Sequence, residues 1–354
     1  MSEIGSSQPQ SLKGPQPLNV AVLGAGTMGT CLAEAFRKIP GVTIKYVFSR
    51  TLIRARSLAE QVGAEPLDQT DRVFVDRAID IVVSCLPTQT RLGTVRSAVQ
   101  AGKHLFCEKP LALNLSMADE ISQLLAAYPK MVMVGQVLRF FWEYSRIREI
   151  VLSGQLGKIG TVRLSRCVGY PGSESWFADP EKSGGVVLDL LIHDIDFLRW
   201  AFGEVKQVYA KSLTHTQQGR SDYALLNIEM SSGALAHLEG SWAHPVGSFR
   251  QTVEICGSLG LLHYDSLTSR SLEWIPVETM SQLKSRISLP ETQDRNDPYL
   301  AEVSHFVECV RNDYVPQVTF EDALRSCEIA FLAMDSARSG APLAFDKTVR
   351  TQIG

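Results

Sequence analysis

The sequence predicts two domains: an α/β domain built on a doubly wound parallel sheet, followed by an α+β domain with a large, mostly antiparallel open sheet. Three observations support this. The chain has 354 residues, more than the roughly 250–300 at which a single hydrophobic core usually stops growing. Up to about residue 140, compact apolar runs alternate with helical spacing, the pattern of a parallel sheet. Beyond it, short strand-like runs follow one another with turns between them.

The first domain is predicted to span residues 17–140, after a disordered, Ser-, Gln- and Pro-containing lead-in at residues 1–16. Apolar runs bounded by glycine or proline indicate buried parallel strands, and apolar residues spaced three or four apart indicate helices. We expect strands at 18–26, 42–50, 79–87, 104–110 and 131–140. We expect helices at 27–39, 52–62, 92–101 and 116–127.

The second domain is predicted to span residues 141–354. It begins with a helix at 143–153 and contains a long apolar helix at 186–202. The turn signals Ser232-Gly233 and 257–260 predict hairpins between strands. Expected strands are 161–169, 205–214, 222–232, 233–242, 249–258 and 260–266, and the chain returns to helices at 299–312 and 320–337.

Composition argues against several classes of function. A formal net charge of -3 and a pI near 6.2 give no general electrostatic reason to bind nucleic acid or an anionic membrane. No apolar run approaches the ~20 residues of a membrane helix, and the polar N-terminus is not a signal peptide. Seven widely spaced cysteines without a C-x-x-C pair predict neither a metal site nor a disulfide framework. We expect a cytoplasmic, reduced protein.

The segment Gly24-Ala25-Gly26-Thr27-Met28-Gly29 fits G-x-G-x-x-G between a predicted strand and a predicted helix. The glycines allow a tight turn, close approach of a pyrophosphate and close helix–strand packing, and the helix start offers free N–H groups to the phosphates. Glycines also end strands for purely structural reasons, but the strand before and the helix after favour a dinucleotide site in a Rossmann domain. Gly24, Gly26, Thr27, Met28 and Gly29 are the expected contacts.

The end of the second predicted strand bears on which dinucleotide is bound. An NAD site usually places an Asp or Glu there for the ribose 2′-hydroxyl, but this chain reads Phe48-Ser49-Arg50-Thr51. Ser49 can donate a hydrogen bond to a 2′-phosphate, and Arg50 and Arg54 can neutralise it. The sequence therefore favours NADP(H). The alternative is that the arginines are solvated residues at a helix start and that NAD(H) is also used.

Lys109, in Cys107-Glu108-Lys109-Pro110, follows a predicted strand of the first domain. Ligands of open α/β sheets bind beyond the carboxyl ends of the strands, so Lys109 can reach a nicotinamide and a substrate. A lysine there can stabilise negative charge on a reacting oxygen, and Glu108 is a candidate ion-pair partner. Taken alone, a lysine at a strand end is more often an ordinary surface charge.

Asp189, His193 and Asp196 interrupt the apolar helix at i, i+4 and i+7 and are expected to share one face, with Asp194 pointing elsewhere. A carboxylate buried without a partner is costly, so this polar face must meet something polar. One interpretation is a satisfied core network in which an aspartate orients His193. The other is a cleft where His193 exchanges a proton with a substrate hydroxyl and Asp189 orients His193 or the substrate.

Together these residues resemble the glucose–fructose oxidoreductase / inositol dehydrogenase (Gfo/Idh/MocA) family. The resemblance rests on Glu108-Lys109-Pro110, on G-G-x-x-x-D-x-x-x-H at Gly184, Gly185, Asp189 and His193, and on GQLGKIGTVR at 154–163. It implies that Lys109, Asp189 and His193 form the catalytic group and that the second sheet mediates a homodimer or homotetramer.

One segment departs from the family. Members commonly read P-N-x-x-H after the third long strand, whereas this chain has Pro87-Thr88-Gln89-Thr90-Arg91. No role is carried over for the missing histidine. We still expect the nicotinamide to be bordered by Leu86, Pro87, Thr88, Glu108 and Lys109.

The resulting hypothesis is a hydride transfer between a nicotinamide and a secondary alcohol or ketone carbon of a sugar, inositol or related polyol. His193 would exchange the proton and Lys109 would stabilise the oxyanion. Substrate contacts are expected from Lys109, Asp189 and His193, together with Arg139 and Trp176. A tryptophan in a loop is, however, as often a packing anchor.

Three alternatives remain open at this stage. The chain could cleave glycosides with transient use of NAD, reduce a non-sugar carbonyl, or sense NADP as a non-catalytic regulator. The retention of Lys109, Asp189 and His193 speaks against the regulator, because a sensor needs no proton-transfer group.

Overall fold

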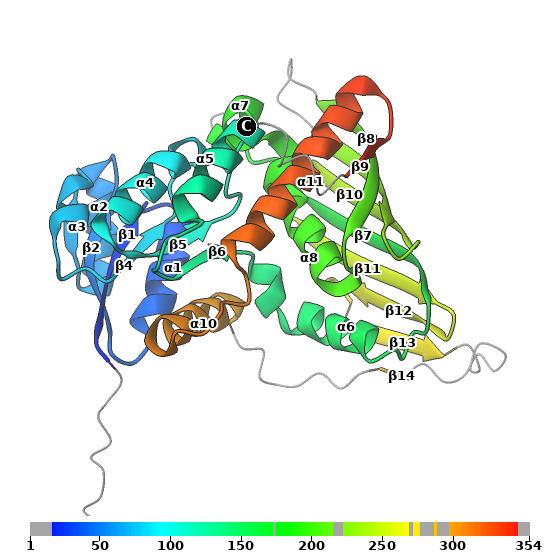
Figure 1. Ribbon diagram of the computed structural model, residues 1–354, viewed down its shortest axis with the longest axis horizontal. Coiled ribbons are helices and arrows are strands. Elements are labelled where there is room, and N and C mark those ends of the chain that lie inside the picture. Colours follow the sequence, from blue (N-terminus) through cyan, green and yellow to red (C-terminus); the bar gives the residue numbers. More distant parts are fainter. Residues whose placement is uncertain are drawn as a thin grey trace, which may run out of the picture.

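The computed structural model describes residues 16–172, 175–214, 222–268, 272–276, 287–288 and 297–345. Two sheets stand side by side, each with its own helices, and α11 (Phe320–Ser339) runs between them (Figure 1). The predicted lead-in lies outside the described residues except for residue 16. Within the described ranges, every helix is too short or too polar to traverse a bilayer.

The first sheet has six strands in the order β3-β2-β1-β4-β5-β6, and every neighbouring pair is parallel. The chain starts in the middle and winds outward in both directions, which confirms the predicted doubly wound sheet. Its central strands β1 and β4 are buried except at Asn19, because helices cover both faces. The strands are β1 (Leu18–Leu23), β2 (Val42–Phe48), β3 (Glu65–Leu67), β4 (Ile81–Ser84), β5 (His104–Glu108) and β6 (Val132–Gly135).

The four predicted helices of this domain begin and end within two residues of the expected positions, whereas the short helix α3 was not predicted. Gly63 and Gly102 end two of them in the left-handed conformation, which glycine adopts without steric cost. The expected strand at 131–140 is shorter than predicted, because β6 ends at Gly135 and a 3₁₀ turn follows. The elements are α1 (Thr27–Arg37), α2 (Leu52–Val62), α3 (Asp71–Val75), η1 (Thr88–Thr90), α4 (Arg91–Ala101), α5 (Leu115–Leu125) and η2 (Val137–Phe140).

The second sheet has nine strands in the order β14-β13-β12-β11-β7-β10-β9-β8-β15. All its pairs are antiparallel except β7 with β10, so the prediction of a mostly antiparallel sheet is confirmed. Both predicted hairpins, β9–β10 and β11–β12, are present. The strands are β7 (Ile159–Gly169), β8 (Val205–Thr214), β9 (Asp222–Met230), β10 (Leu235–His244), β11 (Phe249–Gly257), β12 (Gly260–Asp265), β13 (Leu272–Pro276), β14 (Ile287–Ser288) and β15 (Leu343–Ala344).

Helices cover one face of this sheet (Figure 1). They include α6 (Trp142–Leu152) and α8 (Ile192–Phe202), preceded by η3 (Trp176–Ala178), α7 (Pro180–Ser183) and the π-helical turn η4 (Val186–Leu190). The turn packs tightly on β10, since a Cβ at Gly240 would lie 2.6 Å from Leu191. The predicted single helix at 186–202 is therefore two elements.

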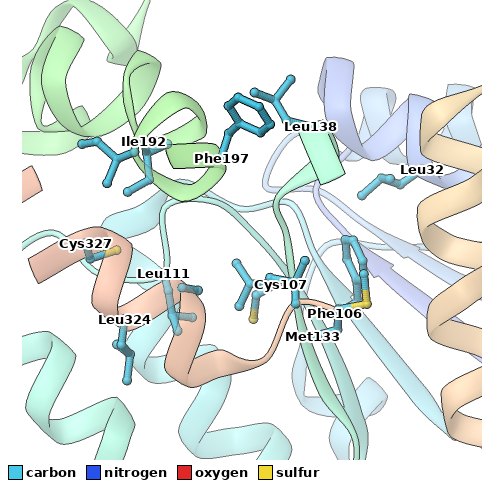
Figure 2. Packing of buried hydrophobic residues seen from close by; sticks show 14 of the residues in the cluster. Leu32, Phe106, Cys107, Leu111, Met133, Leu138, Ile192, Phe197, Leu324 and Cys327 are labelled. Carbon is cyan, nitrogen blue, oxygen red and sulfur yellow. The ribbon is translucent and has the colours of Figure 1, made fainter. Parts of the chain in front are cut away.

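The last two long helices join the domains. The helix α10 (Pro298–Asn312) packs against α1 of the first domain, whereas α11 packs on α5 and also on α8. One continuous hydrophobic cluster results, from Leu32 and Phe106 in the first domain to Ile192 and Phe197 in the second (Figure 2). The carboxyl ends of β4, β5 and β6 are in this way held next to α8.

Candidate active site

The glycine loop joins β1 to α1, and each glycine has a separate structural reason. Gly24 has φ +114°, and a Cβ there would lie 2.8 Å from the carbonyl oxygen of Cys85 on the neighbouring strand. A Cβ at Gly29 would lie 1.8 Å from the carbonyl oxygen of Gly24. A Cβ at Gly26 would meet nothing within 4 Å. Gly24 and Gly29 thus close the turn, whereas Gly26 leaves open space at the start of α1.

The beginning of α1 suits an anionic ligand. No side chain caps its N-terminus and its first turn contains no acidic residue, so its free N–H groups and the positive end of its dipole face outward. Thr27 is exposed at this end, and Met28 is half-buried against the core. The predicted contacts at Gly24, Gly26, Thr27, Met28 and Gly29 therefore occupy one helix terminus, the geometry that binds a pyrophosphate.

A pocket of about 350 Å³ opens at the carboxyl ends of β1, β2 and β4. Phe48, Leu86 and Pro87 supply apolar walls, and Arg50 lies at its edge. Ser49 is half-buried, and Arg54 is exposed in the first turn of α2. Thr88 begins the η1 turn and is only 1 % exposed, and its contact with the cofactor stays a prediction.

Lys109 reaches from the end of β5 to the second domain. Its Nζ donates hydrogen bonds to the backbone carbonyl oxygen of Asp189 at 2.7 Å and to its Oδ1 at 3.1 Å. The side chains of Lys109 and Asp189 are 17 % and 11 % exposed. The expected pairing of Lys109 with Glu108 is wrong, because successive strand residues point to opposite faces and Glu108 instead accepts the backbone N–H of Lys109 at 3.2 Å.

Asp189 is presented by the π-helical turn η4. The turn is entered through Gly184 and Gly185, with φ +78° and +65°, and a Cβ at Gly184 would lie 2.4 Å from Leu188. A π turn leaves backbone groups out of the regular i→i−4 pattern and often occurs at functional sites. Here a carbonyl oxygen of that turn is available to Lys109.

His193 lies in the first turn of α8, four residues after Asp189. Its Nδ1 is fully buried and has no hydrogen-bond partner among the described residues. Burial lowers the pKa of His193 well below its ordinary value, and the nearby cations of Lys109 and Arg166 lower it further. The imidazole is therefore neutral at neutral pH and can accept a proton. Asp189 does not orient it, contrary to one prediction, because the Asp189 carboxylate is bound to Lys109.

The site thus combines an anion-binding loop, an interdomain lysine–aspartate pair and a neutral histidine. A family model described as "Oxidoreductase family, NAD-binding Rossmann fold" matches residues 18–136, and one described as "GFO/IDH/MocA C-terminal domain" matches residues 144–263. The chain belongs to the GFO/IDH/MocA family. It is a nicotinamide-dependent oxidoreductase of the kind that acts on CH–OH groups, and the predicted resemblance is confirmed.

Curated members of the GFO/IDH/MocA family match over nearly the full length. A scyllo-inositol 2-dehydrogenase (NAD(+)) of Bacillus subtilis (strain 168) is 31% identical over 337 residues, 92% of this chain and 96% of that protein. A myo-inositol 2-dehydrogenase of Thermotoga maritima is 26% identical over 94% of this chain and 100% of that protein. The solved structure of a levoglucosan dehydrogenase with NADH and levoglucosan superposes with a TM-score of 0.85 and covers 94% of this chain and 100% of that chain. At 19% identity, this likeness shows a shared fold.

Arg139 does not have the place expected for a substrate contact in this GFO/IDH/MocA chain. It is 4% exposed and binds the carboxylate of Asp196 through two hydrogen bonds of 2.7 and 2.8 Å. It also donates to Asp322 at 3.0 Å and to the carbonyl oxygen of Gln317 at 2.6 Å. We correct the prediction: Arg139 is a buried ion-pair partner that ties η2 to α8 and α11.

The expected shared face of Asp189, His193 and Asp196 is also wrong. Asp189 turns to Lys109, whereas Asp196 turns to Arg139. Asp194, which we expected to point elsewhere, is buried against Arg166 of β7 at 2.6 Å. The polar residues of this segment contact separate basic partners because the π turn breaks the regular helical spacing.

Trp176 lies in η3 and is half-buried. Its ring stacks on Phe177 with a centroid distance of 4.0 Å. The following helix α7 contacts η1 of the first domain, so this segment adjoins the cofactor domain. Residues 173–174, which precede η3, lie outside the described residues.

The sequence reasoning missed two buried arginines. Arg91, which stands where the family commonly has histidine, donates to the carbonyl and hydroxyl oxygens of Ser84, each at 2.8 Å. Arg166 is 2% exposed and holds Asp194. The strand pattern could have revealed Arg166, because alternation places it on the same buried face as Val162 and Leu164. Arg91 has no comparable signal, since its partners are backbone and hydroxyl oxygens at the end of β4.

Proposed function

We propose that this protein transfers a hydride between a nicotinamide and a secondary alcohol or ketone carbon of a sugar, inositol or related polyol. The observation that carries the proposal is the pair formed by Lys109 and Asp189, one from each domain, beside the neutral His193. Alcohol oxidation can be catalysed by a cation, a carboxylate and a neutral base of this kind at the carboxyl end of a nucleotide-binding sheet. The curated relatives named as inositol dehydrogenases support a polyol substrate.

The proposed roles follow from charge. When bound, the nicotinamide supplies the hydride acceptor. His193 takes the hydroxyl proton as the C–H hydride leaves, because its neutral imidazole carries a lone pair on one ring nitrogen and its side chain is only partly buried. Lys109 donates a hydrogen bond to the substrate oxygen and stabilises the negative charge that develops there. Asp189 fixes the Lys109 ammonium and balances its charge.

The loop Gly24, Gly26, Thr27, Met28 and Gly29 is proposed to hold the pyrophosphate. The pocket lined by Leu86 and Pro87 is proposed to hold the adenosine half of the cofactor, instead of the nicotinamide expected from the sequence, because Phe48 and Arg50 line the same pocket. The open space at Gly26 fits a pyrophosphate, since a side chain there would occupy it. Glu108 and Lys109 lie at the end of β5, on the other side of β4 from the adenosine pocket, and the nicotinamide is proposed to lie there.

NADP(H) is the preferred cofactor in this proposal. Among the described residues that line the adenosine pocket, Arg50 is the one charged side chain, and no carboxylate is present for a ribose 2′-hydroxyl. Ser49 and Arg54 flank Arg50. The alternative is NAD(H), as in the Bacillus subtilis relative named for NAD(+). Kinetics with both cofactors test this, and a clear preference for NAD would contradict it.

A panel of sugars, inositols and keto-sugars, followed by nicotinamide absorbance, tests the reaction. Turnover of a polyol with stoichiometric cofactor reduction supports the proposal. Release of a sugar without net reduction would indicate glycoside cleavage instead. Lys109→Ala and His193→Ala should lose turnover yet keep cofactor affinity, because neither residue lies in the phosphate loop.

The open face of the second sheet is proposed to mediate a homodimer or homotetramer. The helices α6, α8 and α11 lie on its other face (Figure 1), and β10 alternates buried residues with outward ones such as Leu235, which is 58% exposed. A shallow hollow along this face includes Leu235, Tyr209 and His237. Light scattering of the purified protein tests the assembly, and Leu235→Glu should convert it to monomers.

A further inference from the structure

Glu302 is a buried acid that the proposed reaction does not use. It lies on α10 with no exposure to solvent. Neither of its carboxyl oxygens has a hydrogen-bond partner among the described residues. A buried polar group without a partner destabilises the fold, so this position needs an explanation other than stability.

The helix α10 brings Glu302 to the carboxyl end of β5. The ring of Phe306 packs edge-on against Phe106 at 5.5 Å. Glu302 precedes Phe306 by one helical turn, so the two side chains share a face of α10. Glu108 follows Phe106 by two strand positions, so these two side chains share a face of β5. The two carboxyl groups are close enough for Glu108 to raise the pKa of Glu302.

Gly135 makes room for the Glu108 side chain. It is the register partner of Glu108 on β6, and a Cβ there would lie 3.2 Å from Glu108 Oε1 and 3.4 Å from the Phe106 ring. Glu108 therefore extends sideways over the neighbouring strand, beneath α10. Its other oxygen accepts the backbone N–H of Lys109, which keeps the carboxyl group next to the proposed catalytic lysine.

The surroundings favour a proton on Glu302 over one on Glu108. Burial raises the pKa of both groups, and for Glu302 the negative charge of Glu108 adds to this effect. For Glu108 the cations of Lys109 and Arg91 act in the opposite direction. Glu108 therefore loses its proton first. Other titratable groups around the pair are Cys31 and Glu34 of α1, Cys85 and Cys107 at the ends of β4 and β5, Asp297 and Tyr299 at the start of α10, and Asp189 of η4.

We propose that Glu302 is a positioning residue that holds a proton next to Glu108 and, by keeping or releasing it, sets the charge beside the nicotinamide. The pair releases this proton to solvent when oxidised cofactor binds and retains it when reduced cofactor binds. The physical reason is that an oxidised nicotinamide ring carries a positive charge, which favours the ionised form of a nearby carboxyl group, whereas the reduced ring is neutral. The inference rests on the proposed function, because the ring must lie beside Lys109.

Calorimetry measures the released proton directly. Binding of oxidised and reduced NADP is titrated in buffers of different ionisation enthalpy, which gives the number of protons exchanged for each form. For the wild type, oxidised cofactor releases more protons than reduced cofactor. For Glu302→Gln, which has the same shape but cannot release a proton, this difference is lost. Glu108→Gln tests the pair from its other member and should lose the difference too.

Affinity gives a second readout. In the wild type, Kd for oxidised cofactor falls several-fold as the pH rises, because binding releases a proton. In Glu302→Gln this pH dependence is reduced. Glu308→Gln is the matched control, since it is the same substitution on an exposed position of the same helix, and it should behave as the wild type.

The outcomes separate this inference from the proposed function. A wild type that binds neither cofactor form would overturn both. Cofactor binding with equal proton release for the two forms, or a Glu302→Gln variant that keeps the wild-type difference, would overturn the role of Glu302 alone. Melting temperatures of the three variants establish that they are folded.

Discussion

Replacing Lys109 with methionine removes the interdomain cation while keeping a side chain of similar length. In the folded protein the Lys109 ammonium makes two hydrogen bonds to Asp189, and both side chains are largely buried. The substitution therefore has two separate effects. It removes a hydrogen-bond donor from the reacting oxygen, and it leaves the Asp189 carboxylate without its cation.

The two effects, on the rate and on the stability, have different magnitudes, and a second substitution should reverse only the loss of stability. Loss of one donor aimed at developing negative charge lowers kcat by about 10²–10³, or roughly 3–4 kcal/mol. Breaking a buried ion pair on one side costs about 3 kcal/mol of folding free energy, which for a chain of this size lowers Tm by about 4 °C. Adding Asp189→Asn to Lys109→Met removes the unpaired charge, so it should restore part of Tm without restoring the rate.

The assay combines initial rates, followed by nicotinamide absorbance, with thermal unfolding and cofactor binding by fluorescence. Cofactor Kd should change by less than about threefold, because the phosphate loop is untouched. Lys130→Met, an exposed lysine of the same domain, is the matched control and should leave every measurement unchanged. A Lys109→Met enzyme with wild-type kcat, or a double variant as active as the wild type, would refute the role of the lysine.

Three further predictions concern the histidine, the buried arginine and the glycine loop. Because burial and cations hold the pKa of His193 well below its ordinary value, kcat/KM should stay constant as the pH falls to about 6.5. A fall in kcat/KM near pH 6.5 would contradict a neutral imidazole. Arg139→Met leaves Asp196 buried and unpaired and should cost about 3–5 kcal/mol, seen as a lower Tm; an unchanged Tm would mean that the ion pair adds nothing. The added Cβ of Gly26→Ala meets no protein atom, so this variant should fold normally and raise cofactor Kd about tenfold; normal cofactor binding would argue against a pyrophosphate at this loop. Gly29→Ala would instead place its Cβ 1.8 Å from a carbonyl oxygen of the same loop and should fail to fold.

The fold was most predictable where local signals were complete. The helix 52–62 is found at the predicted residues because Gly63 ends it in a left-handed conformation. The strand 205–214 is likewise found at its predicted residues. In contrast, β3 and α3 have only three and five residues and were missed. The strand β3 forms because its neighbour β2 provides hydrogen bonds, and that long-range support leaves no local pattern. The helix α3 is little more than one turn, too short for an apolar periodicity to show in the sequence.

The site was predictable in its residue types and less so in their partners. The position of Lys109 at a strand end suggested the right edge of the sheet, but its partner lies 80 residues away at Asp189. Sequence adjacency instead suggested Glu108. Arg139 was assigned to the substrate because its partners, Asp196 and Asp322, are 57 and 183 residues distant. Long-range ion pairs of this kind depend on tertiary packing, which residue spacing does not reveal.

The arrangement of the catalytic segment shows why helical spacing failed there. A π turn has the same apolar residues as an α-helix, so the sequence pattern does not distinguish them; only the two preceding glycines, with positive φ, distinguish this one. Its three carboxylates, Asp189, Asp194 and Asp196, each bind a cation from a different element: the end of β5, β7 and η2. These ion pairs hold the segment in place, and the Nδ1 of His193 is its one buried side-chain nitrogen or oxygen without a partner in the described structure. The orientation of the proposed base therefore follows from charge pairing across the domain boundary rather than from the periodicity of its own helix.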